Sequence, residues 1–138
     1  METSNKINTA TIISDGQTLE LAYQLISVAD AKSTIVFLHD SLGCISVWKG
    51  FPERLCKHLK TNGIVYDRQG HGLSCPFSIE RRPDYMIKEA NILNELLTTI
   101  EGEKAAETQV EAQEQHVEAG APKYILFGHS DGGSIAIL

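Results

Sequence analysis

Tyr124–Ala136 reads YILFGHSDGGSIA, and this stretch near the end of the chain decides the fold that we predict. An apolar run breaks into Gly-His-Ser-Asp-Gly and resumes as small residues of helical character, a pattern typical of a strand, a sharp turn and a helix. Glycines two residues before and two residues after Ser130 leave room for a serine in a strained backbone conformation with an exposed hydroxyl. The stretch therefore predicts a nucleophilic serine at position 130.

Ser130 needs activating partners, and the sequence does not identify them. A serine hydroxyl is a weak nucleophile until an imidazole takes its proton, and that imidazole needs an acid to orient it. His129 is adjacent on the turn, and the other histidines lie in loops, on a predicted helix and in an acidic segment: His39, His71, His58 and His116. None is an obvious base. The alternative interpretation of Ser130 is a helix N-cap.

Strand and helix patterns alternate along the rest of the chain. Residues 9–14 and 19–26 flank Asp15-Gly16-Gln17 and predict an antiparallel hairpin. Buried strands are predicted at 34–38, 63–66 and 123–127, and helices at 46–60, 84–100 and 130–138, the first interrupted at Pro52. The second helix is expected to bury Met86, Ala90, Leu93, Leu97 and Ile100. This order predicts an α/β fold with a mostly parallel sheet.

Two loops that follow predicted strands carry further polar residues. The loop His39–Gly43 can offer a backbone N–H to a developing oxyanion, and the N–H of Asp131, at the start of the last helix, is the second candidate donor. His39 is interpreted as a brace for its loop, because one histidine beside one aspartate is no metal site. Asp67 and Arg68 are interpreted as a structural pair, with Asp67 as catalytic acid the alternative.

Composition excludes several classes of protein. The 138 residues are 42% hydrophobic, which suits one small domain. No apolar run reaches membrane-spanning length and no signal peptide is visible, so we expect a cytoplasmic protein without membrane contact. Three cysteines without metal-type spacing predict reduced thiols. The absence of a basic stripe disfavours nucleic acid as a partner, and neither a metal nor a cofactor is expected.

Most of the net charge of −6 lies in one segment. Residues 101–121 contain six acids and a single base, Lys104, with almost no large apolar residue. We interpret this segment as a surface insertion, helical or disordered, with an acidic docking site as the alternative.

The chain resembles the α/β-hydrolase superfamily. Three motifs occur in that family's order, namely His39–Gly43, the sequence YDRQGHGLS at 66–74, and GHSDGG at 128–133. The resemblance covers about residues 12–138 apart from the acidic insertion. Within the superfamily, the sequence is similar to a branch of proteins described only broadly as hydrolases or esterases. It implies that 1–138 is the N-terminal part of a single α/β-hydrolase domain.

The resemblance also implies roles for individual residues. Ser130 would be the nucleophile of a small ester or amide hydrolase, the Asp131 N–H one oxyanion donor, and the N–H of Ser41 or, alternatively, of Leu42 the other. Position 41 is often glycine in that branch, so the Ser41 side chain is a departure. Relatives with an aspartate nucleophile are disfavoured, because the turn holds Ser130.

In this family the acid and the histidine follow the serine in the sequence, and here neither is found after it. We therefore expect little turnover from the chain alone, with a noncatalytic fragment as the alternative. The strand at 123–127, central in the family's sheet, would be an edge that favours self-association.

Overall fold

The computed structural model describes residues 6–76, 82–111 and 123–138. These residues form a five-stranded sheet with three α-helices. In chain order its elements are β1 (Ile7–Ser14), β2 (Gln17–Ile26), β3 (Thr34–Leu38), the short 3-10 helix η1 (Ile45–Trp48), α1 (Phe51–Leu59), β4 (Asn62–Tyr66), α2 (Tyr85–Glu111), β5 (Tyr124–Gly128) and α3 (Asp131–Ile137). The predicted order of strands and helices is confirmed.

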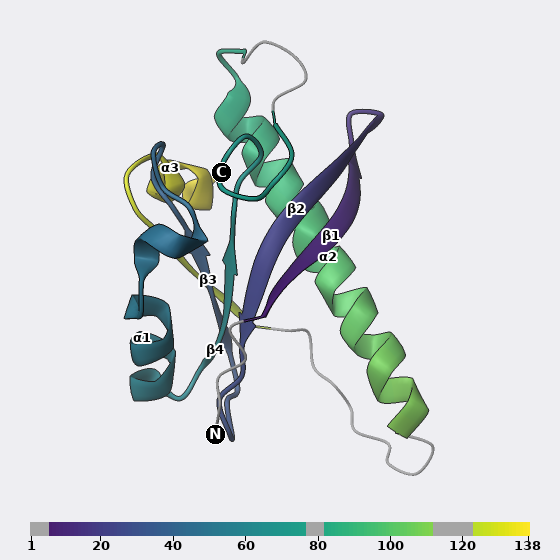
Figure 1. The fold of residues 1–138 in the computed structure, drawn as a ribbon, viewed down its shortest axis with the longest axis vertical. Helices are drawn as coiled ribbons and strands as arrows, with labels where there is room; N and C mark the ends of the chain where they lie inside the picture. The colour runs from purple at the N-terminus through teal and green to yellow at the C-terminus, as the bar shows by residue number, and fades with distance from the viewer. Residues whose placement is uncertain (1–5, 77–81, 112–122) are drawn as a thin grey trace.

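The strands pair in the order β1-β2-β4-β3-β5 (Figure 1). β2 is antiparallel to both β1 and β4, whereas β3 lies parallel to β4 on one side and to β5 on the other. β2 therefore runs against the other four strands, and the sheet is mixed. The hairpin forms because Asp15 and Gly16 both adopt positive φ, which the turn between β1 and β2 requires.

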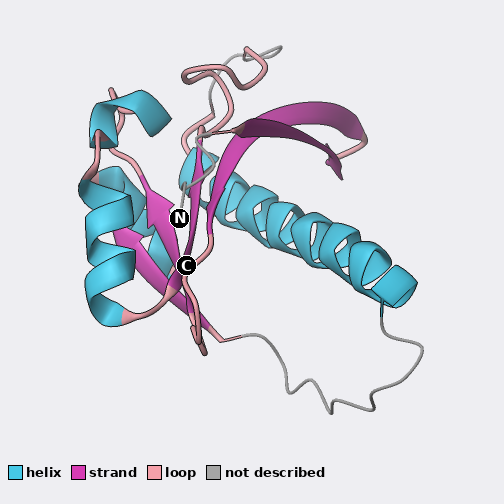
Figure 2. Ribbon diagram, turned by 60° about the horizontal axis from the view of Figure 1, so that its bottom comes forward, coloured by secondary structure: helices cyan, strands magenta, loops and turns pink. Residues whose placement is uncertain are grey.

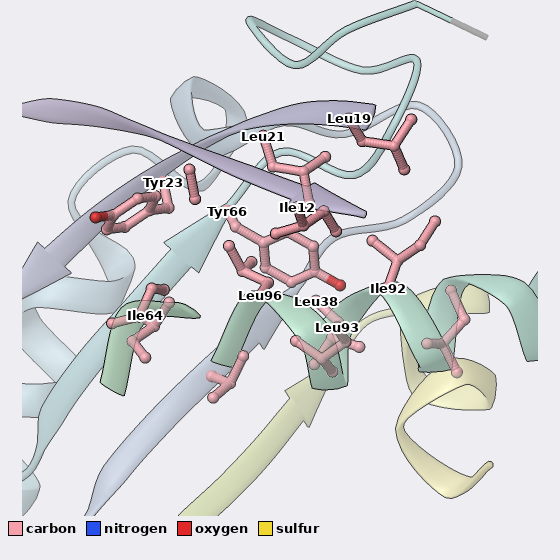
Figure 3. Close-up of a cluster of buried hydrophobic side chains, with 14 residues drawn as sticks. Ile12, Leu19, Leu21, Tyr23, Leu38, Ile64, Tyr66, Ile92, Leu93 and Leu96 are labelled. Carbon is pink, nitrogen blue, oxygen red and sulfur yellow. The ribbon is translucent and has the colours of Figure 1, made fainter. Parts of the chain in front are cut away.

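Helices cover both faces of this sheet (Figures 1 and 2). α1 lies on one face, while α2 crosses the other face alongside the hairpin. Each face has its own buried cluster: Phe37 and Val65 of the sheet pack with Cys56 of α1, and Tyr66, Leu38 and Leu21 belong to the cluster on the α2 side. Figure 3 shows the ring of Tyr66 among leucine and isoleucine side chains from the hairpin and from α2.

The face that α2 buries includes the predicted stripe and extends beyond it. Leu93 and Ile100 are buried, and Met86, Ala90 and Leu97 pack partly buried against the same cluster, so the predicted stripe is confirmed. The prediction omitted Ile92 and Leu96, which are fully buried. Because α2 contacts both β1 and α3, its buried face is wider than a single stripe of spacing three and four.

The helix predicted at 46–60 with an interruption at Pro52 is confirmed. It forms η1 and α1, because Pro52 near the start of α1 has no N–H to continue the preceding turn. Of the acidic segment predicted at 101–121, residues 101–111 continue α2, and 112–121 lie outside the described residues. Within α2, Glu103 accepts a hydrogen bond of 2.8 Å from the Tyr23 hydroxyl. Burial and this carboxylate raise the pKa of Tyr23 to about 12.

β5 lies at the edge of the sheet, as predicted. Among the described strands it pairs with β3 only, and Ile125, Leu126 and Phe127 are each at least 38% exposed. Among the described helices, none is both long enough and apolar enough to cross a membrane.

Candidate functional site

Three loops meet where the parallel strands β3, β4 and β5 end. Carboxyl ends of parallel strands lie at one edge of a sheet, so residues 39–44, 67–76 and 129–130 converge there. Backbone bonds join them directly: the His129 N–H donates to the Leu38 carbonyl at 3.0 Å, and the Arg68 N–H donates to His39 Nε2 at 2.9 Å. The structure thus brings the three predicted motifs together.

Ser130 occupies a strained turn between β5 and α3. Its backbone has φ 57° and ψ −122°, a region that costs a non-glycine residue about 1–3 kcal/mol. The surroundings enforce this conformation, because β5 and α3 approach too closely for side chains. A Cβ on Gly128 would lie 2.4 Å from the Gly133 nitrogen, and one on Gly132 would lie 2.3 Å from the Leu38 carbonyl oxygen. The steric role predicted for both glycines is confirmed.

Ser130 is exposed, and its hydroxyl makes no N-cap hydrogen bond. The interpretation of Ser130 as a side-chain cap of α3 is therefore wrong. The strained backbone of Ser130 instead places its hydroxyl in an exposed position where the three loops meet.

Asp131, the first residue of α3, forms a buried ion pair. Its Oδ1 lies 3.0 Å from Nη2 of Arg68, and the two side chains are 10% and 0% exposed. The predicted pairing of Arg68 with Asp67 is wrong. Asp67 instead accepts hydrogen bonds from the backbone N–H groups of Ile45 (2.6 Å) and Leu73 (2.9 Å). Asp67 therefore joins two loops, and both of its carboxylate oxygens are bonded to backbone N–H groups rather than to an imidazole.

Ser41 and Leu42 are the central residues of a turn closed by the bond from the Gly43 N–H to the Asp40 carbonyl, 3.1 Å. Both are exposed. Within the described residues, neither the N–H of Ser41 nor that of Leu42 donates to a protein group, and the N–H of Asp131 does not either. All three predicted donors are thus free to bind a ligand.

His39 is buried and braces the loops. Its Nε2 accepts the Arg68 N–H, so its proton lies on Nδ1, which donates to the Asp40 carbonyl at 2.6 Å. Burial lowers the pKa of His39 to about 4, and the positive charge of Arg68 adds to that shift. His39 is therefore neutral at neutral pH, and its predicted role as a loop brace is confirmed.

The other described histidines also have partners away from Ser130. His71 contacts the carbonyls of Gln69 and Ser41, and His129 Nδ1 lies 3.5 Å from Asp40 Oδ2. His58 is exposed on α1, and His116 lies outside the described residues. Over the described parts of the chain, no imidazole is bonded to the Ser130 hydroxyl.

A small pocket opens beside the turn. It has a volume of about 220 Å³ and lies between the loop after β3 and His129. Its walls are formed by His39, Asp40, Gly43, Cys44, Val47, Trp48 and His129. No group of three or more histidine, cysteine or acidic side chains in the described residues is arranged to hold a metal ion.

Sequence reasoning missed two of the side chains that organise this site. It took Arg68 for the partner of its neighbour, and it gave His71 no role. Their partners lie 63 and 30 residues away along the chain, so no local spacing signals the contacts. The motif YDRQGHGLS indicates that this loop belongs to the site, but it does not indicate which residue each of its side chains contacts.

Comparison with known proteins defines the class of fold. No protein-family model matches the chain, and no curated protein matches its sequence. Solved structures do match. A protein named as a hydrolase from Agrobacterium vitis S4 superposes with a TM-score of 0.67 at 19% identity, over 96% of this chain and 43% of its own.

Two other matches show the same fold. Alpha/beta hydrolase domain-containing protein 10 from mouse has a TM-score of 0.60 at 19% identity, covering 94% of this chain and 42% of its own. A thermophilic esterase from Thermogutta terrifontis has a TM-score of 0.61 at 20% identity, covering 95% and 39%. The chain therefore has a partial α/β-hydrolase fold, and it spans about two-fifths of the length of these proteins.

Proposed function

We propose that this chain carries the nucleophile and the oxyanion donors of a serine hydrolase acting on a small ester or amide. The observation that carries the proposal is the backbone of Ser130, held at φ 57° with its hydroxyl exposed between two tightly packed glycines. A strained turn of this kind is a nucleophile elbow, in which the hydroxyl projects toward substrate. The pocket of about 220 Å³ beside it suits a small acyl group.

The proposed chemistry is acyl transfer to Ser130. The serine oxygen attacks the carbonyl carbon, the carbonyl electron pair moves onto oxygen, and that oxyanion is stabilised by the N–H of Asp131 and by that of Ser41 or Leu42. The hydroxyl proton needs an acceptor. Because Ser130 has no imidazole partner in the described residues, we expect the proton to pass to water and the reaction to be slow. In serine hydrolases that lack a triad member, the remaining groups still accelerate the reaction by about 10³–10⁴-fold over water.

The test combines a fluorophosphonate probe with p-nitrophenyl acetate. We expect slow labelling of one site per chain, identified as Ser130 by peptide mass spectrometry, with no sustained turnover of the ester. Ser130→Ala should abolish the labelling. Ser134→Ala removes another exposed serine four residues away and should leave labelling unchanged.

Each other outcome has a definite meaning. Rapid labelling together with sustained turnover would show that a general base already acts on Ser130. If a folded chain reacts with neither reagent, the second candidate is favoured, a noncatalytic chain that binds a partner through the edge of its sheet. The exposed apolar side chains of β5 are the observation that supports this second candidate.

A further inference from the structure

His71 lies between two of the loops that form the site. Its Nε2 is 2.9 Å from the Ser41 carbonyl oxygen, and its Nδ1 is 3.0 Å from the Gln69 carbonyl oxygen. A carbonyl oxygen only accepts hydrogen bonds, and a neutral imidazole has a single N–H. The ring can therefore donate to both carbonyls only when both of its nitrogens carry a proton.

The contact at Ser41 controls the peptide that follows it. The Ser41 carbonyl and the Leu42 N–H belong to one planar trans peptide, in which the two groups point in opposite directions. A hydrogen bond from His71 to that carbonyl thus sets the direction of the Leu42 N–H. The hydrogen bond from the Gly43 N–H to the Asp40 carbonyl joins the two ends of the turn. The Ser41–Leu42 peptide lies between these ends, and His71 contacts it.

Several ionisable groups lie on the two loops that His71 joins. The His39 ring is packed against it with centroids 4.8 Å apart. Asp67 is bonded to two backbone N–H groups, and Arg68 is paired with Asp131. Asp40, at the start of the turn, faces His129 at 3.5 Å. His39 remains neutral above pH 5, because its pKa is about 4, so it does not change charge in the range where histidines usually titrate.

We propose that His71 is a positioning residue for the oxyanion hole: its ring donates to the Ser41 carbonyl and holds the Ser41–Leu42 peptide so that the Leu42 N–H, rather than that of Ser41, is the second donor to the oxyanion. This inference rests on the proposed function and deepens it at the same site. Preorganised donors contribute most to catalysis, because they need not reorient as charge develops. Reactivity of Ser130 should then fall when the side chain at position 71 cannot donate to the Ser41 carbonyl.

The experiment follows the rate at which a fluorophosphonate labels Ser130 at pH 6. In that reaction the serine oxygen bonds to phosphorus, fluoride leaves with the electron pair of the P–F bond, and the hydroxyl proton passes to water. His71→Leu should lower the rate at pH 6 by at least about tenfold, since loss of an oxyanion donor costs about 10²–10³ in rate. His58→Leu, an exposed histidine on α1, is the matched control and should have no effect.

His71→Gln separates positioning from packing. Its side-chain amide can donate to the Ser41 carbonyl, so this variant should keep most of the labelling rate that His71→Leu loses. A His71→Gln protein that labels as slowly as His71→Leu, or a folded His71→Leu protein that labels as fast as wild type, overturns the proposal.

A second measurement keeps this inference distinct from the proposed function. If a folded wild-type chain is not labelled at all, the proposed function fails, and the positioning role is then decided by nuclear magnetic resonance. The Leu42 amide signal of His71→Leu should differ from that of wild type, and His71→Gln should restore it. A Leu42 amide signal that is the same in wild type and in His71→Leu overturns the positioning role, whatever the labelling result.

Discussion

Arg68 carries a permanent charge into the interior, beside the turn that holds Ser130. Its side chain is fully buried, and Asp131 provides the one acceptor that the described residues supply to the guanidinium. A buried charge is tolerated only when it is paired, so the pair is sensitive to loss of either member. Asp131, the residue that follows Ser130, therefore stabilises the fold in addition to being a candidate oxyanion donor.

We expect Asp131→Asn to lower the free energy of unfolding by about 3 kcal/mol, because it leaves the Arg68 charge buried without compensation. Urea unfolding at low protein concentration measures the change. The matched control is Asp84→Asn, which removes the carboxylate of the exposed Arg82–Asp84 pair, 3.7 Å apart with side chains 81% and 63% exposed. Exposed pairs contribute about 0–1 kcal/mol, so an equal loss in both variants would contradict the buried role of Asp131.

At the scale of elements, the packing of α3 on β3 depends on Gly132. A Cβ there would lie 2.3 Å from the Leu38 carbonyl oxygen and 2.6 Å from that of His39. Both obstacles are backbone atoms at the end of a paired strand, so they cannot move aside without disturbing the sheet. The same contact sets the distance between α3 and the sheet, and with it the position of the Ser130 turn.

Gly132→Ala should therefore destabilise the protein by about 2–3 kcal/mol through overpacking, and it should reduce labelling of Ser130. Gly102→Ala is the control in the exposed part of α2, where an added Cβ meets no atom within 4 Å. Alanine is the better helix former by about 0.8–1.0 kcal/mol, so this variant should be more stable than wild type. Urea unfolding compares the two; a Gly132→Ala protein as stable as wild type would show that α3 is free to shift.

The elements and the site were predictable from sequence to different degrees. The runs 34–38 and 128–133 carry their own signals, β-branched residues in one and glycines flanking a serine in the other, so β3 and the Ser130 turn could be predicted locally. The contacts of Arg68 and His71 could not, because they join loops that only the sheet order brings together. The wider buried face of α2 was missed for the same reason: the sequence of one helix does not show how many elements pack against it.

At the scale of the whole molecule, the β5 edge is the feature that governs association. Among the described residues no strand lies beside its outer row of backbone groups, and Ile125 is 49% exposed. Phe127 is partly covered by the rings of Phe37, Trp48 and Phe51, with centroids 5.6–6.0 Å apart. An apolar edge strand of this kind pairs readily with another chain.

We expect the 138-residue chain to self-associate through this edge at micromolar concentration, and sedimentation velocity measures it. Ile125→Lys should shift the distribution toward monomer, because charged side chains on an edge strand oppose pairing. Ile13→Lys is the control, since Ile13 is 68% exposed on β1, the strand at the opposite edge of the sheet. If both variants dissociate the assembly equally, association does not depend on β5, and a sharp monomer peak for the wild-type chain would remove the prediction altogether.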